Sequence, residues 1–382
     1  MCDEFQYRVV QGLQRMKLMS LQRQMVIFEN ALPASDPGTL EQLKELSSRR
    51  RAIESINQNS FVTEAIAREM SGGLTSRCEQ NIQKVEQYLP LLRNLIHHVN
   101  IVADNPKIVR WISDLKIRWS SALTSSSFFG PKFYQIDNLH FELAMILLVL
   151  GALLRDRALE VLSAGMDLVQ SASILRKAAG VYQHLAQDVL PHLQAEFPPE
   201  ALISVSAATA LVCLAEAQAV TVKKAEQKGN TGGLLAKLHY GVCEFLNEAI
   251  HALHSATKQC KDISSLLDYI TTCKMLHELL SYKYLAESLK IEGKIGLSIG
   301  ALRHGIQSSE KHTPREESWR LVYKQVIDDL TMLLRKYEHE NEFVWHEKIL
   351  MHDELPIPQG VKIVSSIPYQ PQRWERTLVF KI

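Results

Sequence analysis

The sequence predicts an all-α protein, and proline placement, hydrophobic periodicity and loop length are the observations that predict it. Between Pro199 and Pro356 the only proline is Pro314. Because proline costs about 3 kcal/mol inside a helix, this region is free to be almost entirely helical. Apolar residues recur there at steps of three or four, for example at positions 266, 270, 273, 276 and 280, which places them on one face of a helix.

Weaker helical patterns precede this region. They predict helices over 8–29, 39–70 and 76–99 and then, after a loop at 124–131, a helix pair over 137–164 and 165–190. The apolar run Leu143–Leu154 lies in the first helix of that pair. A membrane-spanning helix needs roughly 20 apolar residues, so this shorter run predicts a buried helix instead.

Short breaks divide the proline-poor region into helices of about 17 to 30 residues. They fall at 229–233, 259–263, 292–293 and 312–314. Loops of this length join antiparallel neighbours. Residues 201–342 are therefore predicted to form stacked helical hairpins, similar in layout to tetratricopeptide arrays but lacking the sequence signature of those repeats.

The character of the chain changes after Glu342. Residues 343–382 contain four prolines with interspersed valines and isoleucines, which favours an extended tail lying along the helices. The sequence thus predicts three parts: an N-terminal helical part (1–108), a helical core with hairpins (109–342) and the extended tail (343–382).

Charge and composition exclude several classes of protein. The chain has 382 residues, with 43 Lys and Arg against 42 Asp and Glu, for a formal net charge of +1. This balance excludes a polycationic nucleic-acid binder. The N-terminus has no apolar core of signal-peptide length, and the six cysteines form no CxxC pairs, so we expect a cytoplasmic protein that meets membranes only peripherally or through a partner.

One nucleophile motif is present. Gly296-Leu297-Ser298-Ile299-Gly300 matches the GxSxG elbow letter by letter. The elbow needs a strand that turns sharply into a helix, whereas both flanks here have helical patterning. We expect the two glycines to let two helices approach closely, and we predict no catalytic residue and no small-molecule substrate.

Histidine patterns do not complete a metal site. His277-Glu278 begins like HExxH, but Ser281 occupies the place of the second histidine. His251 and His254 could share a helix face, yet no closing set of ligands follows at zinc-site spacing. The sequence predicts no metal and no cofactor.

Five ordered blocks carry a resemblance to a known family. They are Phe141–Met145, Ala178–Tyr182, Leu214–Gln218, Leu234–Leu238 and Asn341–Glu347. In this order they resemble the Bro-one domain family of the Alix and Brox type, and most closely its plant, domain-only Brox-like members. The resemblance covers about residues 109 to 350.

The resemblance implies an elongated, boomerang-shaped helical domain with tetratricopeptide-like hairpins and a tail packed along it. It also implies a non-enzymatic adaptor of the ESCRT pathway, cytoplasmic and recruited to endosomes, that acts in multivesicular body sorting or membrane remodelling. The implied partner is the amphipathic C-terminal helix of an ESCRT-III subunit of the Snf-seven type, held on the concave face. The family's three apolar contact positions fall on Thr221, Leu234 and Leu238, although Thr221 departs from the aromatic residue of Alix.

Two other hypotheses remain open from the residues alone. In one, the protein is a helical scaffold in which the leucines belong to the core and another face meets an unrelated protein partner. In the other, Ser298 is the nucleophile of an esterase. Leu234 and Leu238 lie one helical turn apart, so under the adaptor hypothesis they form one apolar patch.

Overall fold

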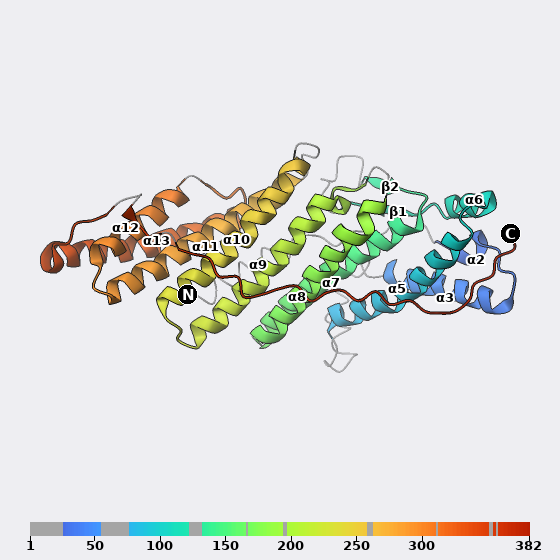
Figure 1. The fold of residues 1–382 in the computed structure, drawn as a ribbon, viewed down its shortest axis with the longest axis horizontal. Helices are drawn as coiled ribbons and strands as arrows, with labels where there is room; N and C mark the ends of the chain where they lie inside the picture. The colour runs from blue at the N-terminus through green and yellow to red at the C-terminus, as the bar shows by residue number, and fades with distance from the viewer. Residues whose placement is uncertain are drawn as a thin grey trace. The chain divides into compact units, whose positions relative to one another are not determined.

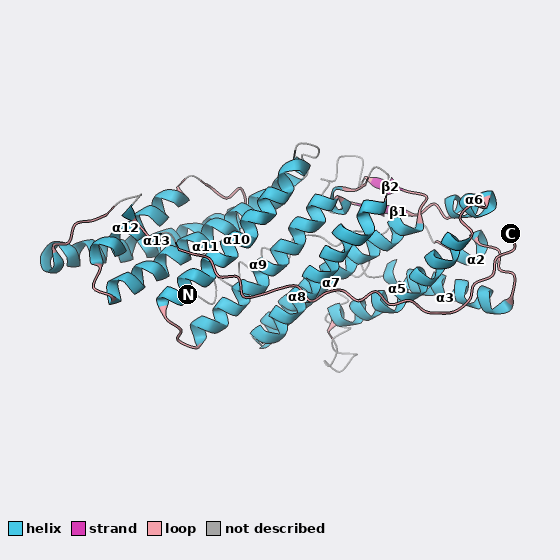
Figure 2. Ribbon diagram, in the orientation of Figure 1, coloured by secondary structure: helices cyan, strands magenta, loops and turns pink. Residues whose placement is uncertain are grey.

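A computed structural model describes the chain over residues 26–54, 76–121, 132–165, 167–193, 197–257, 263–310, 312–350, 354–356 and 358–382. Helices make up almost all the regular structure of these residues, as Figures 1 and 2 show, and the predicted all-α class is confirmed. Two compact units divide the chain. The amino-terminal unit comprises the described parts of 16–160, 180–207 and 367–382, and the hairpin unit those of 161–179 and 208–366.

In the amino-terminal unit, polar side chains cap the starts of two helices. The first described elements of this unit are α2 (Phe28–Ala31), α3 (Pro37–Glu54), α5 (Arg77–Ile101), α6 (Pro106–Asp114), β1 (Arg118–Ser120) and β2 (Phe133–Gln135). Ser76 accepts the backbone N–H of Glu79 at 3.2 Å at the start of α5. Asn105 accepts that of Lys107 at 2.9 Å at the start of α6. Each side chain satisfies a donor that a helix start leaves without a partner.

The two strands are a feature that the sequence pattern did not reveal. They pair antiparallel, with Trp119 opposite Tyr134 in the central pair. Each strand has only three residues, which is too short for the period-two alternation by which strands are recognised in a sequence.

Helix α7 (Leu139–Gly165) forms the core of the amino-terminal unit. Every residue from Phe141 to Leu150 is buried, which confirms the buried helix predicted from the apolar run. Within it, the Glu142 carboxylate is fully buried and accepts hydrogen bonds from the Nε of Arg50, the Nε1 of Trp119 and the hydroxyl of Tyr88. Buried charges persist in proteins when paired in this way.

Helix α8 (Leu168–His184) follows, and it continues as a π-turn, η3 (Leu185–Val189), and a 3₁₀ turn, η4 (Leu190–His192). Another 3₁₀ turn, η5 (Pro199–Ala201), leads into α9 (Ile203–Gln227). α9 is apolar and long enough to span a membrane by length and composition, but 67% of its apolar window is buried inside the protein. It therefore has the character of a core helix.

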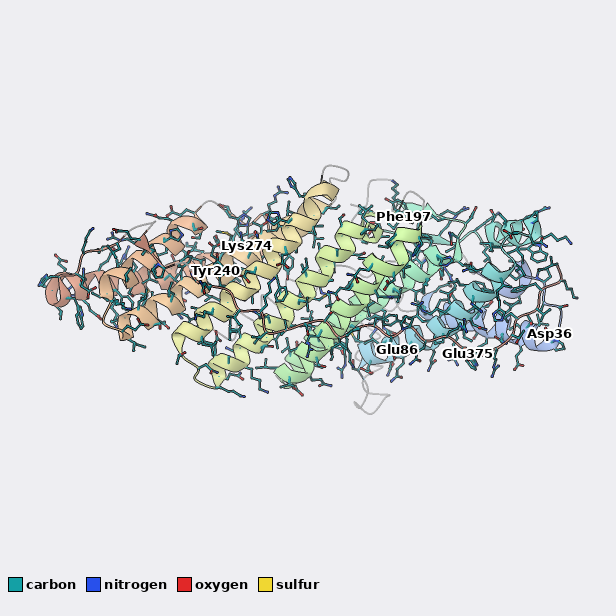
Figure 3. The ribbon with its side chains drawn as sticks, viewed as in Figure 1. Asp36, Glu86, Phe197, Tyr240, Lys274 and Glu375 are labelled. Carbon is teal, nitrogen blue, oxygen red and sulfur yellow. The ribbon has the colours of Figure 1, made fainter. Side chains whose placement is uncertain are left out.

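The hairpin unit contains the consecutive helices that the proline-poor region predicts. After α9 they are α10 (Gly232–Thr257), α11 (Ser264–Ile291), α12 (Ile295–Ser309) and α13 (Glu317–Glu340), which ends in a π-turn, η7 (Asn341–Trp345). α10 packs on α11, α11 on α12 and α12 on α13; Figure 3 labels Tyr240 and Lys274 on the first two of these neighbours. The predicted breaks at 229–233, 292–293 and 312–314 are confirmed, and most of the break at 259–263 lies outside the described residues.

The described residues of the tail, 346–350, 354–356 and 358–382, are mostly extended, as predicted, and the tail begins three residues later than expected because η7 reaches Trp345. In the hairpin unit the N–H of Val361 donates to the carbonyl of Lys237 at 3.1 Å. In the amino-terminal unit the N–H of Trp374 donates to the carbonyl of Pro90 at 3.2 Å, and the N–H of Ser35 to that of Val379 at 2.8 Å. The tail is thus held by backbone hydrogen bonds along its length.

Glycines mark the places where the tail backbone comes closest to the helices. A Cβ atom at any of them would collide with a tail carbonyl; the pairs are Gly180 with Ile367, Gly241 with Val361, Gly296 with Lys348 and Gly300 with Leu350. The expectation that the last two glycines bring two helices together was wrong. The helix face they leave bare is covered by the tail.

Some predictions concern residues that the structure does not describe. These are the helix over 8–29 up to residue 25, the end of the helix over 39–70 beyond Glu54, and the loop at 124–131.

Candidate functional site

The predicted site residues lie at the end of the α9–α10 hairpin, a region from Thr221 to Leu238 that we call the hairpin tip. Its turn is fixed locally. Gly229 has a φ of +69°, a value that glycine adopts without a steric penalty. The backbone N–H and the side-chain amide of Asn230 both donate to the carbonyl of Ala225, at 3.2 and 2.9 Å. The turn thus sets α10 antiparallel to α9.

The structure brings the three predicted residues onto one hairpin but gives them different surroundings. Leu234 is 40% exposed, whereas Leu238 is only 4% exposed and belongs to the core. Thr221 is half-buried, and its hydroxyl donates to the carbonyl of Ala217 at 2.8 Å. The two leucines therefore do not form one continuous exposed patch, because neighbouring residues cover the second one. Contact between these residues and a partner stays a prediction.

A single buried glutamine joins α9, α10 and the tail beside the hairpin tip. The amide nitrogen of Gln218 donates to the carbonyls of Leu238 and Val361, both at 2.9 Å. Its oxygen accepts the N–H of Ile363 at 3.0 Å. Gln218 thereby pairs with the tail much as a neighbouring strand would. The signal available in the sequence was a polar residue within an otherwise apolar helical stretch.

The tail also adds apolar surface near the hairpin tip. Val361 is 37% exposed and Ile363 is 50% exposed, although the backbone of each is fixed by Gln218. Side chains on a fixed backbone lose less conformational entropy when a partner covers them. The exposed apolar groups of this region thus come from two segments far apart in the sequence.

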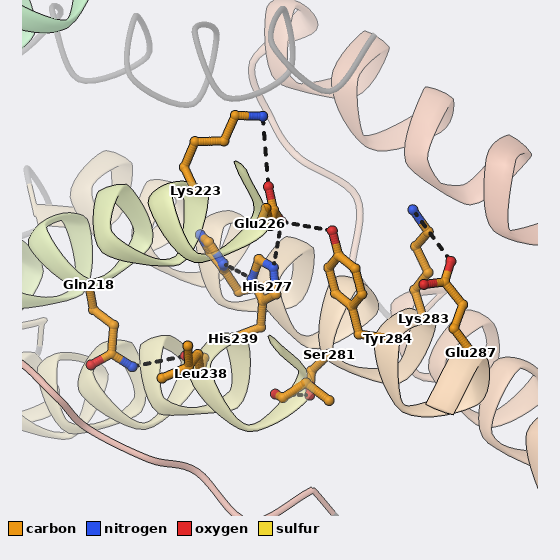
Figure 4. Close-up of polar contacts among 11 residues, drawn as sticks. Gln218, Lys223, Glu226, Leu238, His239, His277, Ser281, Lys283, Tyr284 and Glu287 are labelled. Carbon is orange, nitrogen blue, oxygen red and sulfur yellow. Dashed lines mark hydrogen bonds and ion pairs between the residues drawn. The ribbon is translucent and has the colours of Figure 1, made fainter. Parts of the chain in front are cut away.

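Figure 4 shows a buried polar network that ties the hairpin tip to α11. The Tyr284 hydroxyl donates to the Glu226 carboxylate at 2.8 Å, and the Nε2 of His239 lies 3.3 Å from the same oxygen. The Nδ1 atoms of His239 and His277 are 3.0 Å apart, so one of them donates to the other. Lys223 lies 3.7 Å from Glu226.

Within this network, the pKa shifts distinguish a neutral residue, His277, from a charged one, Glu226. Burial, with the nearby His239, lowers the pKa of His277 to about 3, so His277 is neutral at ordinary pH. Burial raises the pKa of Glu226, but the hydrogen bond and charge of His239 and the Tyr284 hydroxyl more than offset this, and the pKa lies below its usual value. Glu226 is thus a carboxylate whose hydrogen-bonding capacity is used inside the protein.

Ser298 has no exposed hydroxyl. It is fully buried in α12, and its hydroxyl donates to the carbonyl of Ala286 at 2.7 Å. The flanks are helical on both sides, whereas the nucleophile elbow requires a strand. The hydroxyl is therefore inaccessible, and the partner that the structure gives it is a backbone carbonyl rather than a base.

The histidines singled out from the sequence are dispersed. His277 belongs to the buried network and His251 is exposed on α10, while Cys260 lies outside the described residues. Within the described ranges, no group of three or more His, Cys, Asp or Glu side chains is arranged to hold a metal ion.

The fold defines a class: a helical domain of packed hairpins along which an extended tail is fastened. The family model described as "BRO1-like domain" matches residues 48–380. The chain therefore belongs to the BRO1-like domain family, which confirms the resemblance carried by the five sequence blocks and extends it beyond 109–350 at both ends.

Relatives of known name agree with this assignment. The human "BRO1 domain-containing protein BROX" is 26% identical over 217 residues, which are 51% of this chain and 51% of that protein, so the match spans about half of each. Among solved structures, the "ALIX BRO1 CHMP4C complex" has a TM-score of 0.69 at 18% identity and covers 93% of this chain and 94% of that one. "Structure basis for endosomal targeting by the Bro1 domain" has a TM-score of 0.67 at 16% identity, covering 92% and 91%. At these identities the two structures establish the fold.

Proposed function

We propose that this protein is a non-enzymatic, ESCRT-associated adaptor that binds the amphipathic C-terminal helix of an ESCRT-III subunit of the Snf-seven type at the hairpin tip. The observation that carries the proposal is the exposed Leu234 on α10, at a contact position implied by the family. Binding is of the helix-in-groove kind, in which an apolar stripe of the partner covers apolar side chains of the groove.

Two similarities support the proposal. The solved structure with the same fold contains the Bro1 domain of ALIX together with CHMP4C, and the other is described as concerned with endosomal targeting. We accordingly place the protein in the cytoplasm, recruited to endosomes during multivesicular body sorting or membrane remodelling. Thr221 and Leu238 complete the proposed site, Thr221 from its edge and Leu238 from beneath.

The test is a titration of a fluorescently labelled peptide from such an ESCRT-III helix against the full chain. Complete burial of a leucine contributes about 1.5–3 kcal/mol. Because 40% of Leu234 is still exposed, its further burial contributes about two-fifths of that, so Leu234→Ala should weaken binding about three- to eightfold. Leu234→Asp should weaken it further, since the partner would bury an unpaired carboxylate.

The burial of Leu238 decides which variants are informative. Leu238→Asp would place a charge in the core and unfold the protein, so it cannot report on binding. The matched control is Leu321→Asp, because Leu321 is a leucine 60% exposed on α13. Equal binding by wild type, Leu234→Asp and Leu321→Asp would contradict the site.

The second candidate, a helical scaffold for an unrelated protein partner, is favoured by the core position of Leu238. It predicts that the folded wild-type chain does not bind the ESCRT-III peptide at all. The same titration therefore separates the two functions.

A further inference from the structure

We infer that the hairpin tip selects an acidic partner: an amphipathic helix whose apolar stripe is flanked by carboxylates at the end that lies over the tip. This inference rests on the proposed function, since it describes the chemistry of the helix that the same site would accept. It depends on the charges that the polar network leaves at the surface.

The charges of the hairpin tip divide into an internal and an external set. Its only carboxylate, Glu226, accepts hydrogen bonds from Tyr284 and His239 and lies 3.7 Å from the ammonium group of Lys223. These contacts use Glu226 and Lys223 inside the protein. The lysines that remain are Lys224, Lys228 and Lys237. None of the three forms an ion pair with any residue in the described ranges.

The three lysines lie on the two helices and the turn that carry the proposed site. Lys237 is exposed and follows Leu234 by three residues, which places both on one face of α10. Lys224 is partly exposed and follows Thr221 by three residues on α9, and Lys228 is exposed where α9 ends. A helix that covers Leu234 therefore meets positive charge on its flanks.

Further along the same face of α10 the tail occupies the charged side chains. Glu244 lies against Gly360 of the tail, and Glu248 pairs with Lys362 of the tail, two to three turns beyond Lys237. Residues 238–248 add no lysine or arginine, so the unpaired positive charge of this face is concentrated at the hairpin tip. The surface thus favours a helix with its carboxylates concentrated at one end, which also sets the direction in which it lies.

Complementary charges of this kind act mainly on specificity and association rate. An ion pair exposed to solvent typically changes an equilibrium by about 1.4- to fivefold, so three lysines together should favour an acidic helix by at least about threefold at low salt. Salt at about 0.5 M shortens the screening length to a few ångströms and should remove most of this preference.

The experiment compares two labelled 20-residue peptides that share one leucine stripe and differ only in their flanks, which carry Glu at one end in the first peptide and Gln in the second. Affinities for the full chain are measured by fluorescence anisotropy at about 50 mM and 500 mM NaCl. The variants are the triple change Lys224→Gln/Lys228→Gln/Lys237→Gln and the control Lys324→Gln, an exposed lysine on α13. Circular dichroism checks that each variant is folded.

We expect the wild type and Lys324→Gln to prefer the Glu peptide at low salt, and the triple variant to bind both peptides alike. Equal affinity of wild type for the two peptides, with binding still lost in Leu234→Asp, would overturn the charge selection and leave the proposed function standing. A preference that persists in the triple variant would also overturn it. If neither peptide binds and the ESCRT-III peptide also fails, the proposed function and this inference fall together.

Discussion

Replacing Glu142 by glutamine tests whether the buried carboxylate organises the amino-terminal unit. In the wild type one oxygen of Glu142 accepts from Arg50 at 2.7 Å and from Tyr88 at 3.2 Å, and the other accepts from Trp119 at 2.7 Å. All four side chains are at most 1% exposed. Glutamine has one acceptor oxygen in place of two, so its amide group must face a donor.

The expected cost follows from these contacts. Removing one partner of a buried ion pair typically costs about 3–5 kcal/mol. Arg50 keeps a second ion pair with Glu54, which places the expectation near the lower end, at about 3 kcal/mol. Urea denaturation followed by circular dichroism and tryptophan fluorescence measures the difference in the free energy of unfolding.

The control is Glu54→Gln, because Glu54 contacts the same arginine from a position that is 11% exposed. We expect this change to cost about 1 kcal/mol, the net contribution of an ordinary hydrogen bond. A Glu142→Gln protein within about 1 kcal/mol of wild type, with an unchanged dependence on urea, would refute the reasoning.

Two further predictions concern the hairpin unit. Burial lowers the pKa of His277 to about 3 in the folded protein, whereas the pKa of a histidine in an unfolded chain is about 6.5. Between these values the unfolded state binds a proton that the folded state does not bind. The free energy of unfolding should therefore fall by about 1.4 kcal/mol for each pH unit below 6.5. Urea unfolding at pH 7, 6 and 5 should show a shallower fall for His277→Leu than for wild type or the exposed control His251→Leu, and parallel slopes would contradict this. Gly241→Ala places a Cβ against the Val361 carbonyl and the Gln218 amide and should loosen the tail at a cost of about 1–3 kcal/mol. Hydrogen exchange of residues 358–366 should accelerate in Gly241→Ala but not in Gly233→Ala, whose added methyl meets only the Ser288 side chain.

Proline and periodicity were sufficient to predict the long helices of the hairpin unit, because both act locally, whereas the short helices α2 and α6 were not predicted. The helix breaks of the hairpin unit depend on residues that cannot continue a helix, and Gly229 and Gly293, both with positive φ, stand at two of them. The strands β1 and β2 depend instead on a pairing between two separate segments of the chain. Each strand has only three residues, which is too few for a sequence pattern that would predict the pairing.

The site was predicted less completely, because burial depends on distant parts of the chain. Periodicity places Leu234 and Leu238 on one side of α10, but it does not show which neighbours cover that side. The tail reaches α9 through Gln218 and Val361, which are 143 positions apart. The lysines were visible in the sequence, yet only the structure shows that Glu226 is turned inward and does not neutralise them.

Three of the five sequence blocks that carry the family resemblance contain a buried polar side chain with a structural role. Glu142 lies in the first block, Gln218 in the third and Asn341 in the fifth. Asn341 exchanges two hydrogen bonds of 3.0 Å with the backbone of Glu347 where the tail begins. Each of these three blocks thus contains a polar residue that fixes how the helices or the tail are joined.

The tail contacts residues made much earlier, so the amino-terminal unit cannot be completed until the tail has been synthesised. In the amino-terminal unit Val379 donates its N–H to the hydroxyl of Thr39, 340 positions earlier, and the N–H of Lys381 donates to the carbonyl of Pro33. At about 5–20 residues per second, translation takes roughly 17 to 70 seconds to cover that interval. During this time α3 has been made while its final neighbour has not, so a helix made early is among the last to reach its finished surroundings.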